Sequence, residues 1–110
     1  MTDAGLIEAD AQRKEALKAA IKSGFLTGNK SKFFLKGGSN LFVLFSGKVR
    51  GQPKALRVIQ VSAIVHEGRP SRQITEMFAP EQGWGFETVL HADPSVREIP
   101  YEAALRWLRP

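Results

Sequence analysis

Residues 41–66 read LFVLFSGKVRGQPKALRVIQVSAIVH, and the pattern of this stretch decides the fold. In residues 41–50 apolar side chains recur at every second position, the period that is typical of a β-strand with one face in a core. A Gly-Gln-Pro-Lys turn follows at 51–54, and residues 55–66 then alternate in the same way. The stretch therefore predicts two long antiparallel strands. Their inward-facing residues are Leu41, Val43, Phe45 and Val49 in the first strand and Ile59, Val61, Ala63 and Val65 in the second.

The outward face of the first long strand changes character along its length. Phe42 and Leu44 make one end apolar, whereas Lys48 and Arg50 make the other end cationic. The preceding residues 32–35 are also rich in aromatic and apolar side chains, and a Gly-Gly-Ser-Asn turn connects them to the long strand. We therefore expect a sheet surface on which aromatic rings lie among positive charges.

The remaining segments complete an α+β domain. Residues 6–23 predict a helix with a narrow apolar stripe, and Gly24 is a suitable C-cap. Residues 72–78 and 86–91 alternate as two further strands, and Pro100 fits the first turn of a short helix. The expected fold is one domain over residues 1–110, in which an N-terminal helix packs on a curved antiparallel sheet of four or five strands and a short C-terminal helix follows.

Composition excludes several classes of protein. The chain has 110 residues, 43% hydrophobic and 25% charged, which is typical of one globular domain. It contains no cysteine, so disulfides, thiol catalysis and cysteine-ligated metal sites are excluded. No apolar run is long enough to cross a bilayer, and residues 1–5 lack the form of a signal peptide. We expect a cytoplasmic protein without a membrane partner.

Positive charge is concentrated in the first half of the chain. Residues 1–57 carry eleven Lys and Arg against four acids, whereas residues 58–110 carry five against seven. No acid lies between Glu15 and Glu67, although nine Lys and Arg do. Because a solvated surface normally mixes both signs, this segregation favours a negatively charged partner. We expect the nine residues to form one connected positive surface.

The basic segment with its aromatic residues predicts a non-catalytic nucleic-acid-binding domain, for single-stranded DNA or RNA rather than duplex. Cationic side chains contact phosphates and exposed rings stack on bases in such domains. Phe33 and Phe34 are adjacent, so in a strand they face opposite ways and one of them is expected to be exposed. The alternative is that both rings are core and that the lysines protect an edge strand. The predicted contacts are Lys30, Lys32, Lys36, Lys48, Arg50, Lys54 and Arg57 to phosphate, and Phe33 or Phe34 to bases.

A second hypothesis is a protein-interaction or inhibitor module that docks its basic face on an acidic partner protein. Trp84 lies between two glycines in the sequence Gln-Gly-Trp-Gly-Phe, so an exposed loop there would offer an aromatic anchor. The competing interpretation is that Trp84 folds back over one end of the sheet. In either case a long edge strand could make a homodimer by sheet extension.

The two histidines are the remaining candidates for chemistry. In strand register Glu87, Val89 and His91 share a face, and His66 ends another strand. Such groups could act as acid and base on an RNA phosphodiester, as in a small basic ribonuclease, or hold a metal with a carboxylate. The spacing contains no HxxxH, HExxH or HxH, and the chain has no GxSxG or phosphate-binding glycine motif. We therefore expect no catalytic activity, no cofactor and no metal.

Overall fold

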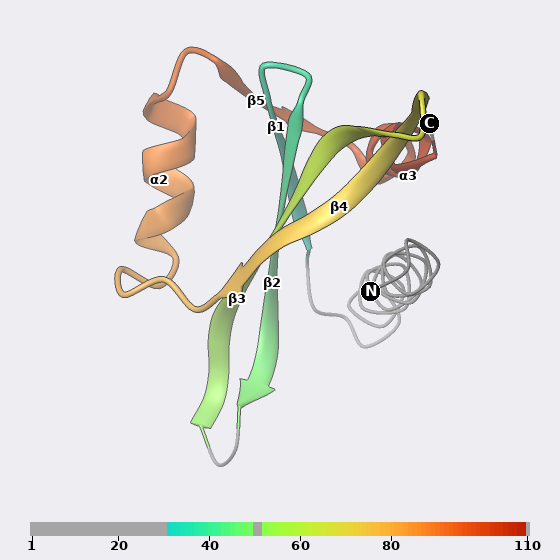
Figure 1. Cartoon of the computed structure of the whole chain (residues 1–110). Helices are drawn as coiled ribbons and strands as arrows, with labels where there is room; N and C mark the ends of the chain where they lie inside the picture. The colour runs from blue at the N-terminus through green and yellow to red at the C-terminus, as the bar shows by residue number, and fades with distance from the viewer. Residues whose placement is uncertain (1–30, 50–51, 110) are drawn as a thin grey trace.

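The computed structural model describes residues 31–49 and 52–109, which form five strands and two helices (Figure 1). The elements in chain order are β1 (Lys32–Lys36), β2 (Asn40–Val49), β3 (Gln52–His66), β4 (Arg69–Phe78), α2 (Gly85–Ala92), β5 (Val96–Ile99) and α3 (Tyr101–Leu108). The α+β class and the antiparallel sheet are confirmed. The helix predicted at residues 6–23 lies outside the described residues.

The strands form one antiparallel sheet in the order β4-β3-β2-β1-β5. Hairpin turns fix this order because β1 to β4 follow one another along the chain. Glu67 and Gly68 connect β3 to β4 with φ angles of 50° and 74°, and a two-residue turn with two positive φ angles matches the twist of an antiparallel pair. The last strand, β5, returns after α2 and pairs with β1 at the opposite edge.

The sheet has a hydrophobic core on each face, so the described residues form three layers of helix, sheet and helix. On one face α3 contributes Ala104 and Leu108 to a core that includes Phe33 and Leu41. On the other face α2 contributes Leu90 to a core built around Phe34. The two helices are visible on opposite sides of the sheet in Figure 1. Both faces of β1 are therefore buried.

The prediction of a strand at residues 86–91 is wrong, because these residues belong to helix α2. Phe86 packs against the core that contains Leu90, and this four-residue separation is the spacing of a helix face rather than of a strand. The alternation of Glu87, Val89 and His91 resembles a strand only because the segment is short. The true fifth strand, β5, is a four-residue segment with little alternation.

The predicted C-terminal helix is confirmed as α3, with Pro100 as its N-cap. Trp107 attaches this helix to the sheet, because its Nε1 donates a hydrogen bond to the carbonyl of Gly38 at 2.9 Å. The guanidinium of Arg72 lies 4.1 Å from the centre of the Trp107 ring, and its Nε donates to the Trp107 carbonyl. The indole is thus held between β4 and the β1–β2 turn. Among the described residues, no helix has the length and apolar character of a membrane span.

Candidate functional site

Neither Phe33 nor Phe34 is exposed, so the prediction that one ring is available for base stacking is wrong. Their relative exposures are 2% and 0%. The alternation itself is correct, since Phe33 belongs to the core under α3 and Phe34 to the core under α2. The sequence pattern did not show that a helix covers each face of the sheet, which is why both rings are buried. The ring centres of Phe33 and Tyr101 on α3 lie 5.8 Å apart, and those of Phe34 and His91 on α2 lie 5.1 Å apart.

Two of the predicted phosphate contacts, Lys32 and Lys36, form ion pairs with acids from the second half of the chain. Lys32 Nζ lies 2.5 Å from Glu87 Oε1, and Lys36 Nζ lies 3.5 Å from Asp93 Oδ2. Asp93 directly follows α2, so this one segment supplies both partners. Charges that are segregated along the sequence are therefore partly neutralised in space.

The described basic residues also do not share one face of the sheet. Lys32 is opposite Leu44 in the β1–β2 register, and Leu44 belongs to the core under α2. Arg57 is opposite Phe45, which packs against the core under α3. Directly opposed residues of an antiparallel pair point to the same side. Lys32 and Arg57 therefore lie on opposite faces, and the prediction of one connected surface is wrong for these residues.

The hairpin of β2 and β3 extends beyond its neighbours. The pairing of β1 with β2 reaches Leu44, and the pairing of β4 with β3 reaches Val58. Among the described residues, positions 45–49 and 52–57 pair with each other and with no further strand, as the lower part of Figure 1 shows. We call residues 45–57 the basic arm, because their only charged residues are Lys48, Arg50, Lys54 and Arg57. Arg50, like Lys30, lies outside the described residues.

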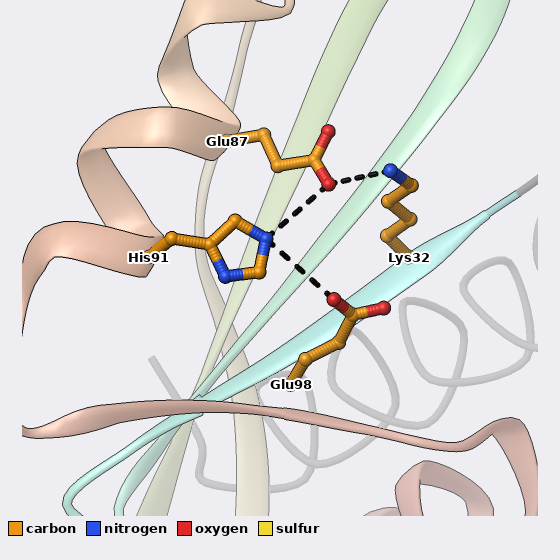
Figure 2. Close-up of polar contacts among 4 residues, drawn as sticks. All are labelled: Lys32, Glu87, His91 and Glu98. Carbon is orange, nitrogen blue, oxygen red and sulfur yellow. Dashed lines mark hydrogen bonds and ion pairs between the residues drawn. The ribbon is translucent and has the colours of Figure 1, made fainter.

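A second site lies where α2 meets the β1–β5 edge of the sheet. Here four charged or titratable side chains converge, as Figure 2 shows. His91 Nε2 lies 3.4 Å from Glu87 Oε1 and 3.6 Å from Glu98 Oε1, and Lys32 binds Glu87 from the other side. We call Lys32, Glu87, His91 and Glu98 the polar cluster. Its members come from β1, α2 and β5.

The fold fixes each member of the polar cluster separately. Glu87 and His91 are four residues apart on α2 and so share a helix face. Glu98 is opposite Phe34 in the β1–β5 register, which places it beneath the His91 ring that packs edge-on against Phe34. The hydrogen bond from Lys32 is the largest of the effects that lower the pKa of Glu87. A helical interpretation of residues 85–92 would have found the Glu87–His91 pair from the sequence.

A cavity of about 450 Å³ adjoins the polar cluster, because Lys32 and Glu98 line both. Its other walls come from the start of β1 and from the junction of β5 with α3, including Phe33 and Tyr101. The Ser31 Oγ in this wall is buried and has no hydrogen-bond partner among the described residues. The cavity therefore combines aromatic walls with polar groups of both charges.

The predicted contact residues are thus divided among three places. Lys32 and Lys36 are paired with acids near α2, whereas Lys48, Lys54 and Arg57 belong to the basic arm. Trp84 is the N-cap of α2 and, at 42% exposure, is one of the exposed large apolar side chains of the described residues. In comparisons with known proteins, no family model, no curated protein and no solved structure matches this chain.

Proposed function

We propose that this protein binds nucleic acid through its basic arm. The observation that carries the proposal is the extension of β2 and β3 past β1 and β4 as a two-stranded ribbon whose only charged residues are lysines and arginines. Lys48, Arg50, Lys54 and Arg57 are four positive charges within ten residues. No acid follows them in the chain before Glu67, so the arm brings no negative charge of its own.

The shape of the arm favours a duplex. A two-stranded β-ribbon has the width that the major groove admits, and cationic side chains along it contact the phosphates on either side. Single-stranded binding depends more on exposed rings that stack on bases. Because Phe33 and Phe34 are buried, the aromatic argument for a single strand no longer applies. Because the major groove of A-form RNA is too narrow for a ribbon, we place duplex DNA before duplex RNA and single strands as the ligand.

The lysines near α2 contribute less to this proposal. Lys32 and Lys36 each lie against a carboxylate, so a phosphate would have to compete with Glu87 or Asp93 for them. Each lysine and its carboxylate together carry no net charge, so at a distance the pair has the field of a neutral group. The basic arm, by contrast, includes no carboxylate, and the salt dependence of binding should therefore arise from its residues.

The test is the salt dependence of affinity, measured by fluorescence anisotropy on a labelled duplex and on the corresponding single strand. The double variant Lys48→Gln/Lys54→Gln removes two charges from the arm. The matched control Arg97→Gln/Arg106→Gln removes two exposed charges elsewhere. Removing a cation that binds a phosphate should reduce the slope of log affinity against log salt by about 1. We expect the arm variant to have a slope shallower by about 2 and the control to behave as the wild type.

Two results would contradict the proposal. The first is equal weakening by the arm variant and by the control, which would mean that only net charge matters. The second is no binding to any duplex or single strand at low salt. In that case the competing hypothesis, a module that docks on an acidic protein with Trp84 as an anchor, would become the better explanation, and Trp84→Ala would be the variant to examine.

A further inference from the structure

We propose that Glu87, His91 and Glu98 form a binding site for a divalent transition-metal ion, with Zn²⁺ as the best match. The proposal goes beyond nucleic-acid binding and does not depend on it. The three side chains come from α2 and β5 and offer an imidazole nitrogen and two carboxylate oxygens that all lie within 4.8 Å of one another. Figure 2 shows the imidazole nitrogen directed between the two carboxylates.

The spacing between the His91 nitrogen and each carboxylate agrees with a tetrahedral ion. Zinc bonds to histidine nitrogen and carboxylate oxygen are about 2.0–2.2 Å long, so two such ligands at the tetrahedral angle lie about 3.3–3.6 Å apart. His91 Nε2 lies 3.4 Å from Glu87 Oε1 and 3.6 Å from Glu98 Oε1. Both distances fall in this range, and the two carboxylate oxygens lie within 4.8 Å of each other.

The surroundings hold the imidazole in place for this role. Its ring packs edge-on against Phe34 at 5.1 Å, and Phe34 is completely buried. Glu87 is fixed by the same helix, whereas Glu98 is positioned by the pairing of β5 with β1. Imidazole nitrogen favours zinc, cobalt and nickel over magnesium and calcium, which prefer oxygen ligands alone. The donor set therefore predicts selectivity as well as binding.

Lys32 compensates the charge of one of the two carboxylates, Glu87, in the absence of a metal. Its ammonium binds Glu87 Oε1, one of the atoms that a metal would use. The amine and the metal ion therefore compete for this oxygen. The two carboxylates and the one ammonium sum to a charge of −1, which attracts a divalent cation. His91 and Glu98 are about half exposed, at 51% and 47%, so an ion can enter.

The chain provides its own control because it contains two histidines and no cysteine. His66 lies at the end of β3 and takes no part in the polar cluster. The experiment uses full-length protein without an affinity tag, titrated with Zn²⁺ by calorimetry and with Co²⁺ by absorption spectroscopy. Variants His91→Gln and Glu98→Gln remove one ligand each, and His66→Gln is the matched control. Lys32→Met removes the competing ammonium and keeps the apolar stem. Melting each variant without metal verifies that it is folded.

We expect one Zn²⁺ per chain in the wild type and in His66→Gln. Substitution of His91 or Glu98 should weaken binding by at least about 10- to 100-fold, the effect found even for residues that only orient a ligand. Lys32→Met should bind more tightly, whereas a cluster that serves only as an ion-pair network would lose stability and gain no affinity. Absence of Zn²⁺ binding in the wild type, equal affinity in folded His91→Gln, or binding of Mg²⁺ as tight as that of Zn²⁺ would overturn the proposal.

Discussion

The adjacent pair Phe33 and Phe34 provides the sharpest test of the three-layer fold, because each ring is the centre of a different core. We predict that Phe33→Ala and Phe34→Ala destabilise the protein to a similar extent. The relative exposures are 2% and 0%, so each substitution removes a fully buried ring. Such a truncation costs about 3–5 kcal/mol. A domain of this size has an unfolding entropy of about 0.23 kcal/mol per kelvin, so the melting temperature should fall by about 13–22 °C in each variant.

The assay is thermal unfolding by circular dichroism, with urea unfolding as a second measure of the same free energy. Met77→Ala is the control, because this side chain is apolar but 67% exposed, and its removal should change the melting temperature little. A large destabilisation in one phenylalanine variant and none in the other would mean that only one face of β1 is covered. That result would refute the placement of either α2 or α3 on the sheet and would restore an exposed ring to the nucleic-acid hypothesis.

Three further predictions concern substitutions of single residues. The hydrogen bond from Lys32 lowers the pKa of Glu87. The stability that this pair provides is therefore complete above about pH 4.3 and is lost as the pH falls. In urea unfolding, the free energy of unfolding of the wild type should approach that of Glu87→Gln in acid. Trp107→Phe removes the exposed hydrogen bond to the Gly38 carbonyl and should cost about 0.5–1.5 kcal/mol in the same assay. Gly68→Ala places a side chain at a φ of 74° and should cost about 1–2 kcal/mol, measured as a lower melting temperature.

The long β2–β3 hairpin was predictable because its alternation extends over many residues. Hydrophobic period is a strong signal when it is repeated, and the expected inward faces are confirmed at Leu41, Val43, Ile59 and Val61. The inward placement predicted for Ala63 and Val65 is wrong, because both are exposed, Val65 by 76%. Beyond Ser62 the strand β3 pairs with β4 but no longer with β2, so this end of the hairpin extends past the core. Residues 86–91 offered too few positions to separate a period of 2 from a period of 3.6. Their helical nature depends on Leu90 and Phe86 packing on the sheet, which is tertiary information.

The charge pattern was a less reliable guide than the hydrophobic pattern. An acid-free stretch of sequence says nothing about acids that the fold brings to it from elsewhere. Glu87 and Asp93 lie more than fifty residues from the lysines that they neutralise. In the described part of the chain the strands of the basic arm extend past β1 and β4, and the arm's own sequence contains no acid. The polar cluster was missed because it required the helix at residues 85–92 to be recognised.

Mapping the contact surface by NMR tests the central claim most directly. At 12.2 kDa the protein suits amide ¹H–¹⁵N spectra during titration with a short unlabelled DNA duplex at low salt. We expect the largest shift changes at residues 46–49 and 52–57 of the basic arm, and little change around Lys32 and Lys36. Changes that are confined to α2 and its neighbouring strands, with the arm unaffected at saturation, would contradict the account.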